Sequence, residues 1–305
     1  MKALVFGSLN IDYVYQTPHF VRKGETLAST AFARFCGGKG LNQAISLSRA
    51  GMDTYMAGAI GPEGDFLLQE LKSAGVNTGF VAQLSVPTGH AVIQNTPDGD
   101  NAILLYGGAN RAITCQMAED VLANFERGDL LLVQNEISDL RAIVHAAKER
   151  GMRIAVNPSP MESSLIQSIL EDADFLILNS LEGTQLLGEK LMSQEEILEK
   201  LSSLRPYQKI VLTLGEKGAM FACEDRRFRQ PAFAVNAVDT TGAGDTFTGY
   251  FLASYFQCED PEKALRTAAA AAAISVTMQG AARSIPDREM TRQFLMNHSL
   301  CMKKT

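Results

Sequence analysis

Short apolar runs alternate along this chain with longer segments in which apolar residues recur every three or four positions. The short runs predict strands at residues 3–7, 54–60, 130–134, 153–157, 175–179 and 209–214. The longer segments predict helices at residues 41–50, 65–73, 116–125, 140–150, 164–170 and 194–204. Because strands that are apolar on both faces need cover on both faces, the pattern predicts an α/β fold with a doubly wound, mostly parallel sheet.

Two segments near the start lack the helical pattern. Residues 13–35 alternate without a helical period, and residues 89–107 carry two apolar runs around a Pro-Asp-Gly-Asp turn, which predicts a hairpin. Since no predicted helix covers these strands, we expect residues of about 11–35 and 88–107 to form a small accessory sheet. We expect it to serve as a lid on a single domain spanning residues 1–305, and a lid excludes water from a site.

The later part of the chain predicts two antiparallel strands, at residues 219–222 and 228–238, ahead of a glycine-rich turn. Helices follow at residues 246–255 and 263–277. The second is rich in alanine, which favours close packing between helices.

Composition narrows the class of protein. The 305 residues are 46% hydrophobic and 20% charged, with a net charge of −6 and no long run of like charges, which argues against a nucleic-acid partner. No apolar run approaches the roughly 18 residues of a membrane helix. Residues 1–7 are too short and strand-like for a signal peptide, so we expect a cytoplasmic protein with no membrane partner.

The cysteines and histidines give little sign of metal or redox chemistry. Cys36, Cys115, Cys223, Cys258 and Cys301 lie far apart without a C-x-x-C pair, and the four histidines show no ligand spacing. We expect reduced thiols and no structural zinc. Cys36 precedes a glycine pair, but an incidental thiol is the favoured interpretation over a catalytic one.

The segment Asp-Thr-Thr-Gly-Ala-Gly-Asp-Thr-Phe at residues 239–247 opens a predicted helix. Gly242, Ala243 and Gly244 let the backbone turn sharply and present N–H groups at the helix N-terminus, where a phosphate is stabilised. A carboxylate at Asp245 would repel that anion unless it had a proton to take, which indicates a general base for a hydroxyl that attacks a phosphoryl group. The alternative is that this segment only caps the helix and makes a turn.

A second glycine turn, Gly-Gly-Lys-Gly at residues 37–40, also leads into a helix but does not have the P-loop spacing. Gly38 lets the backbone approach a small ligand, and Lys39 and Asn42 supply donors. These groups suit a polyhydroxylated ligand, whose buried hydroxyls need partners. A tight turn with a solvated lysine is the alternative.

Three further polar residues follow or end predicted strands. Asn10 and Asp12 lie on the same side of an extended chain, where an amide and a carboxylate can hold neighbouring hydroxyls. Glu136 follows the strand at residues 130–134. Turn formation and helix capping remain alternatives for these residues.

Together with Asn179-Ser-Leu-Glu182, the two glycine turns resemble the carbohydrate kinases of the ribokinase (PfkB) family. The resemblance covers nearly the whole chain, with one signature at residues 37–44 and one at residues 239–249. It implies ATP-dependent phosphorylation of a primary hydroxyl of a small sugar, first of all D-ribose to ribose 5-phosphate. A kinase of fructose, deoxyribose, ketodeoxygluconate or a nucleoside is the alternative.

The resemblance also implies roles for matching positions. Asp245 matches the catalytic base, and Gly242, Ala243 and Gly244 match the anion hole. The positions that hold the sugar are matched by Asn10, Asp12, Gly38, Lys39, Asn42, Glu136 and Asp245. The nucleotide-binding positions are matched by Asn179, Thr213, Gly215, Gly218 and Gly244. Glu182 is implied to organise Mg²⁺ indirectly, and a K⁺ ion is implied at Asp239, Thr241, Ser275, Met278, Gly280 and Ser284.

Other classes fit less well. A catalytically silent sugar-binding protein would typically lose the base or the glycines, and both are present. A nicotinamide-dependent dehydrogenase needs G-x-G-x-x-G after its first strand, which the chain lacks. Leucine precedes Asn179 where many members of the family have proline, and Asn157-Pro-Ser-Pro replaces their Asn-Pro-Ala-Pro, which cautions against assuming ribose. An exposed edge of the lid would favour a homodimer, as in dimeric members of the family.

Overall fold

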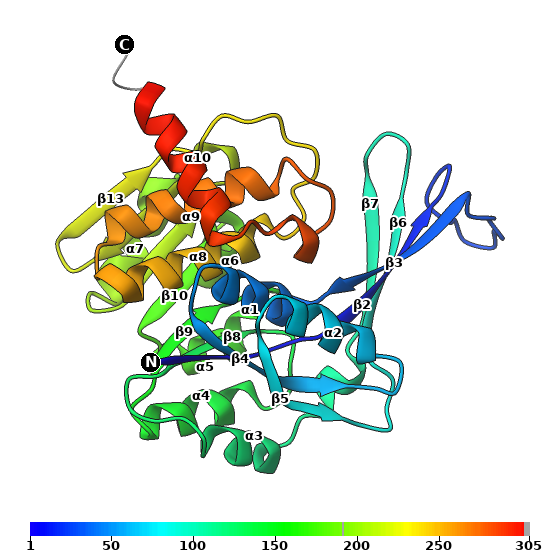
Figure 1. Cartoon of the computed structure of the whole chain (residues 1–305), viewed down its shortest axis with the longest axis horizontal. Coiled ribbons are helices and arrows are strands. Elements are labelled where there is room, and N and C mark those ends of the chain that lie inside the picture. Colours follow the sequence, from blue (N-terminus) through cyan, green and yellow to red (C-terminus); the bar gives the residue numbers. More distant parts are fainter. Residues whose placement is uncertain (191, 302–305) are drawn as a thin grey trace.

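The computed structural model describes residues 1–190 and 192–301, with side chains up to residue 298. A nine-stranded sheet crosses the molecule in the order β13-β12-β11-β10-β9-β8-β1-β4-β5 (Figure 1). Its strands are β1 (Lys2–Phe6), β4 (Asp53–Ile60), β5 (Asn77–Gln83), β8 (Leu130–Gln134), β9 (Arg153–Asn157), β10 (Phe175–Asn179), β11 (Lys209–Thr213), β12 (Ala219–Cys223) and β13 (Arg226–Gln230). The strands from β11 to β5 run parallel, and β12 and β13 are antiparallel to their neighbours. The predicted α/β fold is therefore confirmed.

Helices cover both faces of this sheet, as predicted (Figure 1). One face carries α1 (Lys39–Arg49), α2 (Asp65–Ser73), α8 (Ala243–Cys258) and α9 (Pro261–Ser275), with α10 (Arg288–Cys301) packed on α9. The other carries α3 (Cys115–Leu122), α4 (Leu140–Glu149), α5 (Ser163–Ile169), α6 (Ser180–Leu187) and α7 (Gln194–Leu204).

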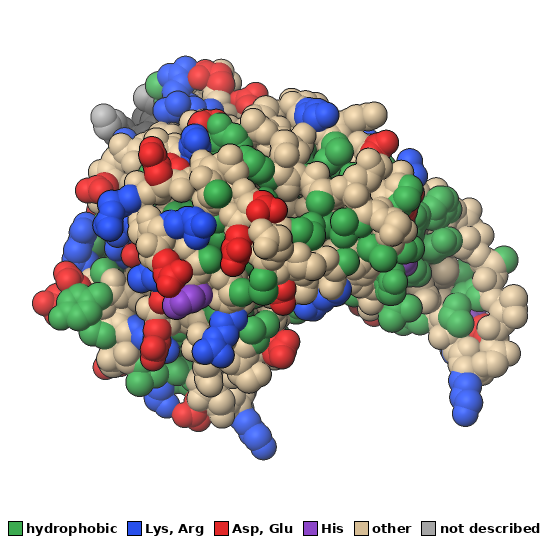
Figure 2. Space-filling model, turned by 90° about the horizontal axis from the view of Figure 1, so that it is seen from below, with side chains coloured by type: hydrophobic (Ala, Val, Ile, Leu, Met, Phe, Trp, Pro, Cys, Tyr) green, Lys and Arg blue, Asp and Glu red, His purple; other side chains and the backbone are tan. Residues whose placement is uncertain are grey.

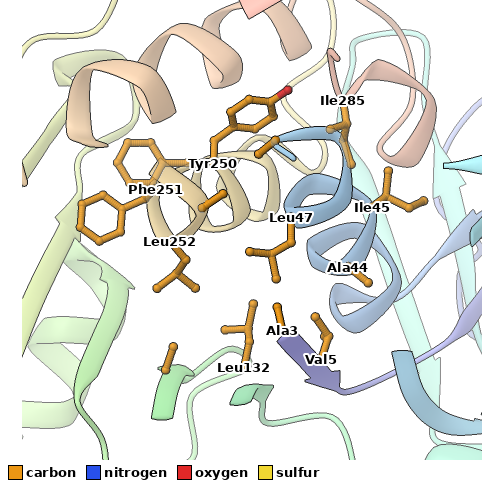
Figure 3. Close-up of a cluster of buried hydrophobic side chains, with 14 of the residues drawn as sticks. Ala3, Val5, Ala44, Ile45, Leu47, Leu132, Tyr250, Phe251, Leu252 and Ile285 are labelled. Carbon is orange, nitrogen blue, oxygen red and sulfur yellow. The ribbon is translucent and has the colours of Figure 1, made fainter. Parts of the chain in front are cut away.

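Successive side chains of each central strand enter different cores, because side chains alternate across a strand. Ala3 and Val5 of β1 join the core under α1 and α8, whereas Leu4 and Phe6 join the core on the opposite face. Figure 3 shows the first core, with Leu47 of α1 lying above these strand side chains. This division explains why the central strands read as continuous apolar runs.

Helices α1 and α8 approach closely at Gly249. A Cβ atom at Gly249 would lie 2.3 Å from Ser46 Oγ and 2.7 Å from the backbone nitrogen of Leu47. Ser46 Oγ also donates a hydrogen bond to Thr246 O, at 2.8 Å. This contact fixes the position of the N-terminus of α8 relative to α1.

A separate four-stranded sheet projects from the body (Figure 1), in the order β3 (Ala31–Gly37), β2 (Asn10–Gln16), β6 (Gly89–Asn95) and β7 (Asn101–Tyr106). We call it the accessory sheet. Strands β6 and β7 form the predicted antiparallel hairpin. Hydrophobic side chains gather on the projecting arm (Figure 2), and Leu104 on β7 is 71% exposed.

Some sequence predictions were wrong. Residues 228–238 are not one strand: β13 covers Arg226–Gln230, and Pro231, which lacks an N–H group, ends it. Residues 17–30 lie outside any strand, although the segment 13–35 alternates throughout. Strand β5 and helices α6 and α10 were not predicted.

Among the described residues, no helix is long and apolar enough to span a membrane. Cys36, Cys115, Cys223 and Cys258 are free thiols, whereas the side chain of Cys301 lies outside the described residues.

Candidate active site

The site lies at the carboxyl ends of the central strands. Strands β1 and β8 are neighbours, but β1 is followed in the sheet by β4 on one side and β8 by β9 on the other. In parallel sheets, ligands bind at the carboxyl ends of strands where the connections diverge in this way. Ser8, which follows β1, donates a hydrogen bond through Oγ to Glu136 Oε2, and Glu136 follows β8. The backbone N–H of Lys39, the first residue of α1, donates to the same carboxylate at 3.2 Å. Glu136 thus joins both strand ends to the second glycine turn.

Asp245 is buried in the first turn of α8, and both its carboxylate oxygens accept hydrogen bonds from α1. Asn42 Nδ2 donates to Oδ2 at 3.1 Å, and Gln43 Nε2 donates to Oδ1 at 2.8 Å. The close packing of α1 against α8 therefore brings together two residues predicted to act in one site, Asn42 and Asp245.

Sequence reasoning missed a buried amide network behind this carboxylate. Gln43 Nε2 also donates to Asn157 Oδ1 at 2.8 Å, and Gln134 Nε2 donates to Gln43 Oε1 at 2.7 Å. Asn157 Nδ2 in turn donates to Ile177 O at 2.8 Å. The available signal was positional: Gln43 follows Asn42 in the glycine-turn signature, and Gln134 and Asn157 end neighbouring parallel strands.

The glycine turn before α8 is built to leave backbone donors free. Gly242 has φ of 74°, and a Cβ atom there would lie 2.9 Å from the Cβ of Ala281. The N–H groups of Gly242 and Gly244 donate to no backbone acceptor among the described residues, whereas that of Ala243 donates to Thr240 O at 3.2 Å. Space beside Gly244 is open, since a Cβ atom there would meet no atom within 4 Å. An anion fits this turn.

A cavity of 140 Å³ opens between the two glycine turns and the ends of β9, β10 and β11. Seven of its lining residues were predicted site residues from distant parts of the chain: Lys39, Asn179, Glu182, Thr213, Gly242, Gly244 and Asp245. The other five were not predicted: Asn157, Ser159, Ile177, Leu178 and Thr248. Gly215 and Gly218 are not among these residues. They have positive φ in the turn between β11 and β12, where a Cβ atom at Gly218 would lie 2.0 Å from Gln230 O.

The charges around the cavity interact strongly. Burial alone would lower the pKa of the Lys39 ammonium group, but the carboxylates of Asp245, Glu136 and Glu182 raise it above its ordinary value. Burial raises the pKa of Asp12 to about 7, and the nearby Glu136 carboxylate adds to the rise. A carboxyl group with a perturbed pKa is typical of functional sites. Asp12 lies on β2 and is not among the residues that line the cavity.

The remaining predicted sugar-binding residues lie at the base of the accessory sheet. Asn10 is buried at the start of β2, and its Oδ1 accepts a hydrogen bond of 2.7 Å from Asn110 Nδ2. Gly38 caps α1 with φ of 93°, and a Cβ atom there would lie 2.8 Å from Ser8 O. Asn110, which also accepts a hydrogen bond from the backbone N–H of Leu9, was not predicted.

Asn179 and Glu182 form a capping box at the start of α6. Asn179 Oδ1 accepts from the backbone N–H of Glu182, and Glu182 Oε2 accepts from the backbone N–H of Asn179, both at 2.9 Å. Both residues also line the cavity. Helix capping therefore explains the spacing of the motif without excluding a second role in the cavity.

Asp239 links the α8 turn to the segment after α9. Its Oδ1 accepts from the backbone N–H of Thr241 at 2.9 Å, and its Oδ2 accepts from that of Gly280 at 2.8 Å. Burial would raise the pKa of Asp239, but the hydrogen bond that the Thr241 hydroxyl donates to Oδ1, together with these two backbone hydrogen bonds, lowers the pKa below its ordinary value. The hydroxyls of Ser275 and Ser284 donate to Ala272 O and Ala281 O, and the segment between them also carries Met278. The predicted cation-binding segments are therefore neighbours, and Asp239 does not cap α8.

Cys36 takes no part in this arrangement. It lies on β3 and is half-buried, and burial raises the pKa of its thiol to about 12. Among the described residues, no group of three or more His, Cys, Asp and Glu side chains is arranged to hold a metal ion.

Comparisons with known proteins agree with this geometry. Residues 1–288 match the family described as pfkB family carbohydrate kinase. The chain is 33% identical to a deoxyribokinase of Salmonella typhi, over 97% of this chain and 99% of that one, and 32% identical to a ribokinase of Haemophilus influenzae, over 95% and 97%. The structure of Arabidopsis thaliana ribokinase complexed with ribose and ATP superimposes with a TM-score of 0.85 at 29% identity, covering 96% of this chain and 98% of that one. This chain therefore belongs to the pfkB family of carbohydrate kinases and is an ATP-dependent sugar kinase.

Proposed function

We propose that the protein transfers the γ-phosphoryl group of ATP to the primary hydroxyl of D-ribose, giving ribose 5-phosphate. The Asp245 carboxylate accepts the proton of the attacking hydroxyl. Free backbone N–H groups at Gly242 and Gly244 stabilise negative charge on the transferring group, with Ala243 contributing less because its N–H already has an acceptor. The observation that carries the proposal is a carboxylate held by Asn42 and Gln43 beside the glycine turn of its own helix.

Several polar groups support a polyhydroxylated acceptor. Asn42 Oδ1 is buried and has no hydrogen-bond partner among the described residues, so a sugar hydroxyl would satisfy it. Asp12 and Glu136 offer carboxylate oxygens, and Asn10 and Lys39 offer donors. Ribose has enough hydroxyls to use these groups. Deoxyribose, which lacks one hydroxyl, is the second candidate because of the similarity to the Salmonella typhi deoxyribokinase.

In this proposal ATP binds on the side of the Gly242–Gly244 turn opposite the sugar. Thr213 and Asn179 line the cavity there, and the turn formed by Gly215 and Gly218 follows β11. Glu182 suits Mg²⁺ that is held indirectly, because one carboxylate oxygen serves the cap while the residue still lines the cavity. When bound, Mg²⁺ neutralises charge on the ATP phosphates.

The segments around Asp239 and Gly280 also suit K⁺. The carbonyl oxygens of Thr241, Met278 and Gly280 accept no backbone hydrogen bond among the described residues, and hard oxygen ligands are the kind that this ion takes. Ser275 and Ser284 flank the same segment. When bound, the ion adds positive charge beside the glycine turn. A higher thermal midpoint in KCl than in NaCl at equal ionic strength, lost in Asp239→Asn, would support this site, and equal midpoints would reject it.

The accessory sheet is proposed to act as a lid and as a dimer interface. Exposed apolar side chains line its outer strand, at Ile103, Leu104, Leu105 and Tyr106. Strand β7 is also an unpaired edge, and pairing or packing with a second subunit would cover both features.

An ADP-release assay across ribose, deoxyribose, fructose, ketodeoxygluconate and nucleosides tests the substrate. We expect the highest kcat/KM on ribose, and higher values on another acceptor would reassign it. Asp245→Asn should lower kcat by about 10²–10⁴-fold while calorimetry still detects sugar binding. Turnover like that of the wild type would reject Asp245 as the base, and no turnover on any acceptor would favour a silent sugar-binding protein.

A further inference from the structure

Gln43 is a fully buried side chain to which the proposed reaction gives no direct task. It lies on α1 next to the apolar core, yet three of its four hydrogen-bonding positions, both donors and one acceptor site, are used by polar side chains. Nε2 donates to Asp245 Oδ1 and to Asn157 Oδ1, each at 2.8 Å, and Oε1 accepts from Gln134 Nε2 at 2.7 Å. A residue that only filled space here would be apolar.

The chemistry of the partners allows one orientation of this amide. An ionised carboxylate can only accept hydrogen bonds, so Gln43 must present its NH₂ group to Asp245. Its carbonyl oxygen then faces Gln134, which must donate. Rotating the Gln43 amide by half a turn would set its oxygen against the Asp245 carboxylate and its NH₂ group against the NH₂ group of Gln134.

The network is also anchored away from the helices. Gln134 ends β8, and Asn157 ends β9 and donates to Ile177 O on β10, at 2.8 Å. These are three neighbouring strands of the parallel sheet. The carboxylate on α8 is therefore held from the rigid centre of the sheet through the Gln43 side chain.

The network contains one buried oxygen atom, Gln134 Oε1, that has no hydrogen-bond partner among the described residues. Leaving a buried acceptor unpaired is unfavourable, and an apolar residue at position 134 would avoid it. The hydrogen bond that Gln134 donates to Gln43 compensates for this unpaired acceptor.

We propose that Gln43 is a positioning residue, which fixes the Asp245 carboxylate so that Oδ2, the oxygen beside Asn42, receives the proton of the sugar hydroxyl. The proposal rests on the proposed role of Asp245 as the base. In this proposal Gln43 affects kcat, whereas the residues that line the sugar site determine the affinity for sugar.

The direct test replaces Gln43 with methionine, which is unbranched and of similar size but donates no hydrogen bond. We expect kcat to fall about 10–100-fold while the KM for sugar stays within about twofold, because misplacing a reacting group costs rate more than binding. Gln134→Met leaves Gln43 in place with an unpaired oxygen, and we expect a smaller fall in kcat, with KM again unchanged.

Gln208→Met is the matched control. Gln208 is also a buried glutamine that donates two hydrogen bonds, to Leu170 O at 3.0 Å and Ala173 O at 2.8 Å, but it precedes the amino end of β11, away from the site. We expect its kcat to match that of the wild type even if its thermal midpoint falls.

Three results separate the outcomes. A folded Gln43→Met enzyme with unchanged kcat, or one whose kcat falls no more than that of Gln208→Met, overturns the positioning role while Asp245→Asn remains inactive. If Gln43→Met does not fold, unchanged kcat in Gln134→Met overturns it instead. Turnover of Asp245→Asn at the wild-type rate overturns the base and the positioning role together.

Discussion

Replacing Asp12 with asparagine should stabilise the protein at high pH and weaken its binding of sugar. The ordinary pKa of this carboxyl group is 3.8, and burial together with the Glu136 carboxylate raises it to about 7 in the folded chain. A raised pKa means that the folded state binds the proton more tightly than the unfolded state. Ionised Asp12 therefore destabilises the fold above pH 7, and this effect disappears as the pH falls toward 4.

The difference between the ordinary pKa of Asp12, 3.8, and its pKa in the folded chain, about 7, corresponds to a destabilisation of the folded state by about 4 kcal/mol at most when Asp12 is ionised. Asp12 is only partly buried, so solvent screening reduces this to about 1–2 kcal/mol. Asparagine keeps the size of the side chain and carries no charge. The free energy of unfolding of Asp12→Asn should therefore exceed that of the wild type by about 1–2 kcal/mol at pH 8, and the difference should narrow steadily between pH 7 and pH 4.

Urea denaturation of both proteins without sugar, across this pH range, measures the difference directly. The same variant should raise the KM for sugar at least about tenfold, because a buried sugar hydroxyl loses a charged acceptor. A difference in unfolding free energy that does not change with pH would refute the reasoning, since it would mean that ionisation of Asp12 does not oppose folding.

Three further predictions concern packing and assembly. Gly249→Ala should separate α8 from α1, lowering kcat more than tenfold and the unfolding free energy by about 1–2 kcal/mol; unchanged kcat would contradict the close-contact argument. Gly38→Ala should raise the KM for sugar. Gly24 also has a positive φ, but a Cβ atom there would meet no atom within 4 Å, so Gly24→Ala should change stability alone. The same KM for sugar in both variants would contradict this prediction. Leu104→Asp should shift sedimentation from dimer to monomer, and Leu204→Asp, at a residue 70% exposed on α7, should not; a dimer in both would move the interface elsewhere.

The layered sheet could be predicted because its central strands are apolar on both faces. Leu131 and Leu132 of β8 enter opposite cores, so no polar residue interrupts the run. Edge strands lack this signature. Strand β5 contains Gly79 and several polar residues, so it was not predicted at all. Strand β13 begins with Arg226 and Arg227, so a strand was predicted there but with the wrong bounds.

Candidate site residues could be named from the sequence where they are contiguous in the chain. The turn at Gly242 and Gly244 and the carboxylate that follows it form one local motif. The partners of that carboxylate do not: Gln134 and Asn157 join it only through the sheet, and a buried glutamine at a strand end gives no local sign of its contact. Pairwise contacts between distant segments require the register of the strands, which periodicity alone leaves undetermined.

The two hydrogen bonds from α1 to Asp245 join residues that are 202 and 203 positions apart in the chain. At roughly 5–20 residues per second, the ribosome makes Asn42 and Gln43 about 10–40 s before it makes their partner. If Asp245 is the base, as proposed, a growing chain holds Asn42 and Gln43 long before it has that base, and we expect no phosphoryl transfer until α8 has packed against α1. On the proposed role of Asp245, enzyme activity reports on completed long-range assembly, and we expect a chain arrested before residue 245 to be unable to phosphorylate sugar.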